Sequence, residues 1–122
     1  MRVLIVDDSN FSQMVITKLI EKYLDDIECY FANDGEQGLK KYKEIKPDYV
    51  IVDLLMPKLN GRELIKLIKE YDKMAKIIVV SADVQKTVKE EMREHDIMTF
   101  INKPINDEKA KAMCDMMKEQ LR

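Results

Sequence analysis

Short runs of apolar residues recur at regular intervals along the chain, and most of them end in a polar or charged residue. Runs of this kind are typical of parallel strands that are buried on both faces of a sheet. On this basis we place strands at residues 2–6, 27–31, 49–53, 77–81 and 98–102. The segments after them carry apolar residues at helical spacing, which predicts helices at residues 10–24, 35–45, 60–71, 84–94 and 106–121.

This succession of strand–helix units predicts one α/β domain built on a doubly wound parallel sheet. Right-handed crossovers put the carboxyl ends of all its strands at the same edge. In the flavodoxin-like strand order 2-1-3-4-5, the first and third strands are neighbours and a cleft opens between their ends. We therefore expect a flavodoxin-like, five-stranded parallel sheet in this order, with five helices, as a single domain over residues 1–122.

Apolar stripes on three of the predicted helices indicate which faces pack on the sheet. The first helix has a stripe of Phe11, Val15, Leu19 and Tyr23, with Ile16 and Ile20 beside it. The fourth helix has Val84, Val88 and Met92, and the last has Ala110, Met113 or Cys114, Met117 and Leu121. We interpret most of these residues as core packing.

Charge balance and the cysteines exclude several classes of protein. The formal net charge is −2 and 36% of residues are charged, so the chain lacks the excess of basic residues that is typical of proteins that bind nucleic acid. No apolar stretch approaches the ~20 residues of a membrane span, and Asp7 comes too early for a signal peptide. Cys29 and Cys114 lie far apart in the sequence, and we expect both to be reduced thiols of a cytoplasmic protein.

Three carboxylates, a hydroxyl and an ammonium come at the ends of predicted strands. Asp7 and Asp8 follow the first strand, Asp53 ends the third, Ser81 ends the fourth and Lys103 follows the fifth. In the expected strand order they meet at one edge, with the acids as nearest neighbours. Clustered carboxylates repel one another, so a cation is needed to neutralise them. Because Mg²⁺ prefers hard oxygen ligands and keeps several waters, this edge suits Mg²⁺ together with a phosphoryl group.

Each of these residues also has an ordinary structural explanation. Asp7 and Asp8 would suit the start of a helix, and Ser81 a helix cap. Lys103 alone would be a surface lysine, and Phe100 alone a core residue. Their joint placement at strand ends favours a functional site.

Several short motifs occur in order along nearly the whole chain. They are Val6-Asp7-Asp8-Ser9, Asn33-Asp34-Gly35-Glu36, Asp53 with Met56-Pro57 and Gly61, Ser81-Ala82, and Phe100 ahead of Lys103-Pro104. Each motif is weak by itself, and together at strand ends they are highly specific. With them the chain resembles a response-regulator receiver domain of two-component signalling, of the single-domain CheY-like kind.

The resemblance implies a role for each residue of the acidic edge. Asp53 would accept a phosphoryl group from a phosphohistidine on a sensor histidine kinase. Asp8, Asp53 and the main-chain carbonyl of Leu55 would bind Mg²⁺ directly, and Asp7 would act through a bound water. Lys103 would hold phosphoryl oxygens on the side opposite the metal.

The resemblance also implies a conformational switch and protein partners. Ser81 would move to hydrogen-bond the new phosphoryl group, Phe100 would turn inward behind it, and the Lys103-Pro104 bond would be cis. A downstream target would bind the face formed by the fourth helix, fifth strand and fifth helix, with Met116 as an exposed anchor. We expect a chemotaxis-type pathway, with a phosphatase as a further partner and a phosphorelay intermediate as the alternative.

Two other functions fit part of the pattern. A phosphohydrolase with an aspartyl nucleophile would carry a second acid two residues after Asp53, where this chain has Leu55. A pseudo-receiver that binds partners without phosphorylation would lack an acid or the lysine. We therefore expect no enzymatic activity beyond self-phosphorylation from a phosphodonor and slow autodephosphorylation. Leu55 replaces a polar amide of the best-known enteric regulator, and with Asp83 it borders the expected path of the hydrolytic water.

Overall fold

The computed structural model describes residues 1–82 and 85–120. Its strands are β1 (Arg2–Val6), β2 (Glu28–Ala32), β3 (Tyr49–Val52), β4 (Ile77–Ser81) and β5 (Thr99–Asn102). Its helices are α1 (Asn10–Tyr23), α2 (Gly35–Ile45), α3 (Gly61–Tyr71), α4 (Lys86–Glu94) and α5 (Asp107–Gln120). Every predicted strand and helix is present, with ends that lie within two residues of the expected ones.

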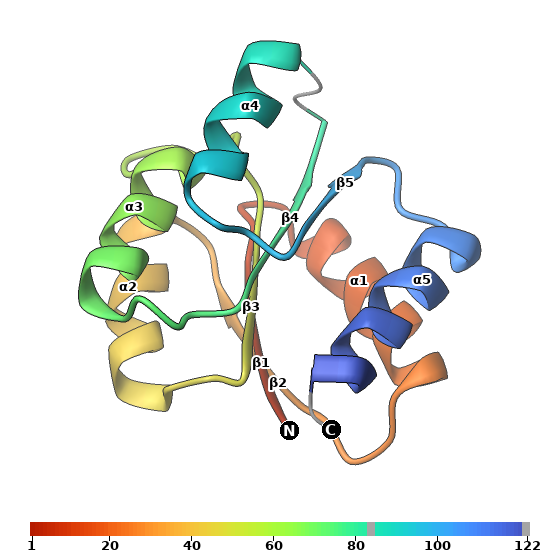
Figure 1. Ribbon diagram of the computed structural model, residues 1–122. Helices are drawn as coiled ribbons and strands as arrows, with labels where there is room; N and C mark the ends of the chain where they lie inside the picture. The colour runs from red at the N-terminus through yellow and green to blue at the C-terminus, as the bar shows by residue number, and fades with distance from the viewer. Residues whose placement is uncertain (83–84, 121–122) are drawn as a thin grey trace.

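The strands form one parallel sheet in the order β2-β1-β3-β4-β5, which confirms the predicted topology. In Figure 1, α1 and α5 cover one face of this sheet, and α2, α3 and α4 lie on the other. The register of the central pair aligns Val6 with Val52. Asp7 and Asp53 follow these two residues, so the fold itself sets their carboxylates side by side.

The alternation of side chains along the strands divides the core into two layers. On β1, Val3 and Ile5 pack toward α1 and α5, whereas Leu4 and Val6 pack toward α2 and α3. All four side chains are fully buried. Burial on both faces is why the strand residues read as continuous apolar runs.

The predicted stripe of α1 was partly wrong. Ile16 and Ile20 are buried as expected beside the stripe, but Phe11 is 71% exposed. The third buried position of this helix is Gln13, which shares a face with Ile16 and Ile20 by its helical spacing. Because α1 has more apolar positions than one face can bury, the spacing alone does not decide which of them turn inward.

The stripes on the later helices are confirmed where the structure describes them. Val88 and Met92 of α4 are buried, and α5 buries a row of residues that consists of Ala110, Met113, Cys114 and Met117. Val84, Leu121 and Asp83 lie outside the described residues. Both cysteines are free thiols, and burial raises the pKa of Cys114 to about 11. Among the described helices, none combines the length and the apolar character needed to cross a membrane.

Candidate functional site

The carboxyl edge of β1 and β3 holds a tight group of acids. The backbone N–H of Asp7 donates to the Ala32 carbonyl, and that of Asp53 donates to the Val6 carbonyl, both over 3.0 Å. These bonds continue the sheet past its last strand residues and fix where each carboxylate begins. Asp7, Asp8 and Asp53 each present an oxygen within 4.8 Å of the others.

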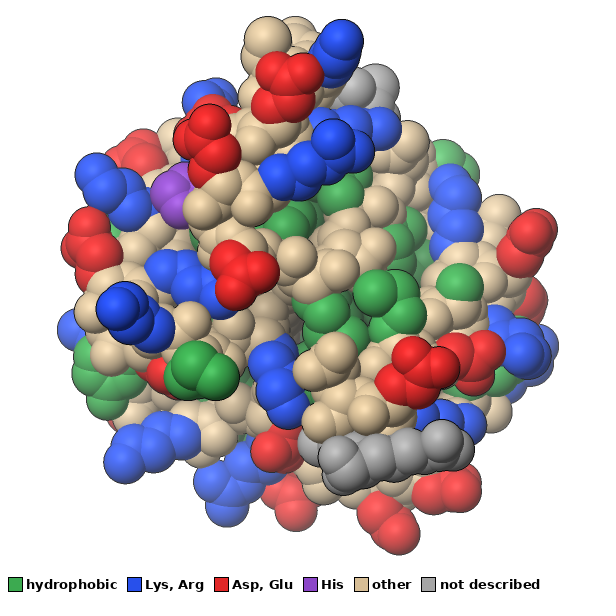
Figure 2. All heavy atoms as spheres, in the orientation of Figure 1, with side chains coloured by type: hydrophobic (Ala, Val, Ile, Leu, Met, Phe, Trp, Pro, Cys, Tyr) green, Lys and Arg blue, Asp and Glu red, His purple; other side chains and the backbone are tan. Residues whose placement is uncertain are grey.

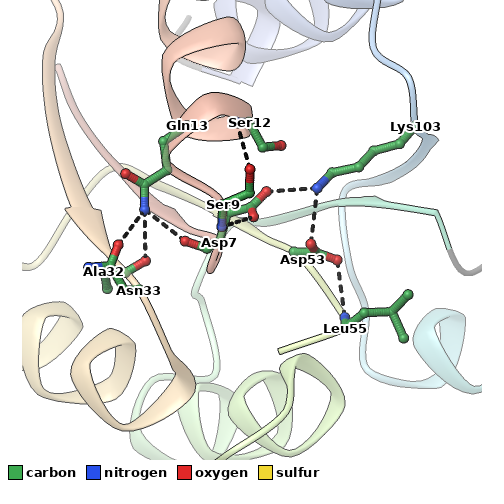
Figure 3. Close-up of polar contacts among 9 residues, drawn as sticks. All are labelled: Asp7, Ser9, Ser12, Gln13, Ala32, Asn33, Asp53, Leu55 and Lys103. Carbon is green, nitrogen blue, oxygen red and sulfur yellow. Dashed lines mark hydrogen bonds and ion pairs between the residues drawn. The ribbon is translucent and has the colours of Figure 1, made fainter. Parts of the chain in front are cut away.

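Lys103 bridges two of these carboxylates. Its Nζ lies 2.8 Å from Asp7 Oδ2 and 3.0 Å from Asp53 Oδ2 (Figure 3). Burial alone would lower the pKa of this ammonium, but its hydrogen bonds and charge interactions with the two acids outweigh burial and raise the pKa. Lys103 is therefore charged at neutral pH, and it partly neutralises the acidic group.

Asp7 and Asp8 differ in how free their oxygens are. The Asp7 residue is 1% exposed, and its Oδ1 accepts a hydrogen bond from the Ser9 backbone N–H over 2.9 Å while Oδ2 faces Lys103. Asp8 is exposed. Asp8 is thus the acid with room to bind a cation directly, and Asp7 is held in place as a neighbour.

Gln13 is part of this site, and the sequence reasoning missed it. Its Nε2 donates to the Asp7 carbonyl over 2.7 Å and to Asn33 Oδ1 over 2.8 Å, with a longer contact to the Ala32 carbonyl at 3.3 Å (Figure 3). The side chain therefore ties the segment after β1 to the segment after β2. A signal did exist, because Gln13 interrupts a buried helical face three residues before Ile16.

Close contacts of the backbone fix the position of Asp53. Its carboxylate is 7% exposed, and Oδ1 accepts a hydrogen bond from the Leu55 N–H over 3.1 Å. A Cβ added at Gly61 would lie 2.2 Å from the Asp53 carbonyl oxygen and 2.6 Å from the Leu54 Cα. Only glycine permits this approach of α3 to the segment after β3. The Leu55 residue is 56% exposed.

Ser81 and Phe100 lie on the neighbouring strands. Ser81 is fully buried at the end of β4, and its carbonyl accepts a hydrogen bond from the Lys103 N–H over 3.0 Å. Phe100 is half-buried and packs on the core layer under α4, and the Lys89 ammonium lies 5.4 Å from its ring centroid. The Lys103-Pro104 bond is cis, as expected from the resemblance.

The donor set fits a hard divalent cation. Three carboxylates and one ammonium leave two negative charges at this edge, which Mg²⁺ would match. Carboxylate oxygens are also the ligands that Mg²⁺ prefers. The structure thus brings Asp7, Asp8, Asp53 and Lys103 together, while the separate roles expected of Ser81, Leu55 and Phe100 stay predictions.

Similarity to known proteins agrees with this geometry. The sequence profile described as "Response regulator receiver domain" matches residues 3–115. Chemotaxis protein CheY of Thermotoga maritima is 42% identical over 103 residues, which are 84% of this chain and 85% of that protein.

Two solved structures have the same fold. One is the CheX–CheY–BeF₃–Mg²⁺ complex from Borrelia burgdorferi, with a TM-score of 0.87, 32% identity and coverage of 100% of this chain and 90% of that chain. The other is the response regulator domain of Thermotoga maritima CheB, with a TM-score of 0.85, 31% identity and coverage of 98% and 94%. The profile match and the similarity to CheY together establish that the chain belongs to the response regulator receiver family.

Proposed function

We propose that this receiver accepts a phosphoryl group on Asp53 from a phosphohistidine of a sensor histidine kinase, and that phosphorylation changes which protein it binds. The observation that carries the proposal is the placement of Asp53. Its carboxylate lies at the carboxyl edge, next to the acids Asp7 and Asp8 and in contact with the ammonium of Lys103. An anionic nucleophile can meet a phosphoryl group there only with positive charge close by.

Asp8 and Asp53 would hold Mg²⁺ directly, with the Leu55 carbonyl as a further ligand and Asp7 acting through water. The assignment of Asp8 as a direct ligand is supported by its exposure next to the buried Asp7. When bound, Mg²⁺ supplies positive charge that offsets the charge of the phosphoryl oxygens.

The chain's own residues then perform the transfer. An Asp53 carboxylate oxygen forms a bond to phosphorus as the phosphorus–nitrogen bond of the phosphohistidine breaks, and the electron pair leaves on the imidazole nitrogen. The Lys103 ammonium, 3.0 Å from Asp53 Oδ2, stabilises the charge on the phosphoryl oxygens. The backbone N–H of Leu55 keeps the carboxylate oriented.

The effect of phosphorylation would reach a target protein through Ser81, Phe100 and the α4–β5–α5 face. Ser81 would turn toward the phosphoryl group, and Phe100 would move further inward beside it. A cavity of about 250 Å³ on this face is lined by residues of β5 and α5 that include Phe100 and Met116. Because methionine side chains are adaptable, this cavity suits a target protein whose binding depends on the position of Phe100.

A chemotaxis-type pathway is the most specific setting we propose for this receiver. CheY of Thermotoga maritima is a chemotaxis protein, and the Borrelia burgdorferi structure holds CheY together with CheX. We also expect a phosphatase that removes the phosphoryl group from this protein. The alternative is that this protein is an intermediate in a phosphorelay.

The direct test uses a small phosphodonor. Incubation with acetyl phosphate and Mg²⁺ should add one phosphoryl group, which intact-mass spectrometry detects. Excess chelator should reduce the labelled fraction to background, because the carboxylates then repel the donor. Labelling that is equal with and without chelator would contradict the metal-dependent site.

Magnesium binding should depend unequally on the two acids after β1. Asp7→Ala should weaken Mg²⁺ about tenfold, as expected for a group that acts through another ligand. Asp8→Ala should weaken it further, because a direct ligand is lost. Calorimetric titration of both variants measures this, with Asp25→Ala as a matched control at an exposed acid outside the site. Parent-like affinity in both variants would place the metal elsewhere.

Leu55 should control how long the phosphoryl group persists. Its exposed side chain has no group that can hydrogen-bond a water, and its bulk would cover the phosphoryl group against in-line attack. Leu55→Asn should shorten the phosphorylated lifetime about tenfold, because an amide can orient the water. Decay after removal of the donor is the measurement, and Met74→Asn is the control at a remote exposed site. An unchanged or longer lifetime would turn attention to Asp83.

A further inference from the structure

The amino edge of the sheet, opposite the acidic site, carries a second pocket. It has a volume of about 380 Å³ and lies between the end of α3, the segments that enter β4 and β5, and the last part of α5. Its lining includes three lysines and three methionines: Lys69, Lys73, Lys76, Met74, Met98 and Met116. This volume is within the range of pockets that hold small ligands or the anchoring side chains of a partner.

The apolar part of the pocket is exposed to an unusual degree. Met74 is 83% exposed, the most of any large hydrophobic side chain in the described residues, and Met116 is 36% exposed. Figure 2 shows hydrophobic side chains next to Lys and Arg side chains in the area between α3 and α5. Flexible thioether side chains of this kind repack readily around apolar side chains of a partner.

The charged part of the pocket is positive although the whole chain is slightly negative. Among the residues that the structure describes, Asp96 is the one acid that lines it, against three lysines. Within residues 1–82 and 85–120, none of these lysines forms an ion pair with an acid. Lys69 Nζ is held by the Ala75 carbonyl over 2.8 Å, so its charge is fixed at the rim, whereas Lys73 is exposed.

We propose that this pocket docks an acidic amphipathic helix of a partner protein. Apolar side chains of the helix would contact Met74, Met98 and Met116, and its flanking carboxylates would face Lys73 and Lys76. The methionine lining favours such a segment over a small anion, which would leave the thioethers exposed to water. The pocket lies at the sheet edge opposite Asp53, so docking does not require phosphorylation. Met116 also lines the cavity on the α4–β5–α5 face, so the docked helix would lie next to a target bound there.

A peptide of defined composition tests the proposal on the intact protein. The probe is a synthetic helix of about 18 residues, long enough to be partly helical alone, with leucines along one face and glutamates beside them. It should shift the methyl NMR signals of Met74, Met98 and Met116 and leave Met14, an exposed methionine on α1, unchanged. A peptide with lysine in place of glutamate should bind at least about tenfold more weakly.

Variants of the protein separate charge-dependent binding from nonspecific apolar binding. Combining Lys73→Gln with Lys76→Gln should weaken the acidic peptide about tenfold, whereas Lys40→Gln, at an exposed position on α2, should not. The parent phosphorylated with acetyl phosphate and Mg²⁺ should bind the peptide like the unphosphorylated parent. The proposal is overturned if the peptide leaves the three methyl signals unmoved or also moves Met14, or if the basic peptide binds equally well. The proposal is also overturned if inorganic phosphate or an oligonucleotide causes the same shifts of the methyl signals. It is likewise overturned if dilution shows that a second copy of the chain covers these methionines.

Discussion

Asp53→Asn should lose phosphorylation by acetyl phosphate completely. The amide has nearly the same shape as the carboxylate, but it carries no negative charge and is a poor nucleophile toward phosphorus. Lys103 keeps its contact with Asp7 at 2.8 Å, so the site should remain folded. Intact-mass spectrometry of parent and variant after equal exposure to donor and Mg²⁺ gives the result.

The matched control for this prediction is Asp25→Asn, which removes one exposed carboxylate outside the site. It should be phosphorylated like the parent. If Asp53→Asn accepted a phosphoryl group to the same extent as this control, another residue would be the acceptor. Circular dichroism of both variants checks that loss of labelling reflects chemistry rather than unfolding.

Gly61→Ala should cause a large loss of stability. The new Cβ would lie 2.2 Å from the Asp53 carbonyl oxygen, and backbone rather than a flexible side chain would have to move. We expect a loss of about 3 kcal/mol, at the upper end of overpacking effects. For a domain of this size, that loss lowers the melting temperature by about 10 °C.

Gly38→Ala provides the comparison, because its Cβ would meet only side-chain atoms of Val6 and Leu64, at 3.0 and 3.1 Å. Those groups can shift slightly, and alanine favours the helix more than glycine does. Thermal unfolding should therefore separate the two variants clearly. Equal melting temperatures for the two would show that the approach of α3 to Asp53 is not tightly constrained. Slower phosphorylation of Gly61→Ala would connect this packing to the position of Asp53.

Much of the fold follows from two features of the sequence. Apolar runs buried on both faces located the strands, and handedness with strand order placed their carboxyl ends on one edge. Asp7 and Asp53 become neighbours as a direct result, because Val6 pairs with Val52. The acidic site was therefore predictable before any side chain was placed.

Other features depend on three-dimensional geometry that the sequence pattern does not contain. The bridge from Lys103 to Asp7 as well as to Asp53 depends on the path of a long flexible side chain. The inward turn of Gln13, in place of Phe11, depends on how α1 rotates against the sheet and α5. The available sign was a polar residue at helical spacing from Ile16 and Ile20. Its three acceptors come from two segments that are far apart in the sequence, one at Asp7 and one at Ala32 and Asn33.

Chemical trapping of the phosphorylated parent tests the central claim most directly. Borohydride reduces an aspartyl phosphate to homoserine, and peptide mass mapping then locates the modified residue. The account predicts one homoserine, at position 53, formed after treatment with phosphodonor and Mg²⁺ and missing when chelator is present. Homoserine at Asp7 or Asp8, or a stable phosphate on a serine with no homoserine at all, would contradict it.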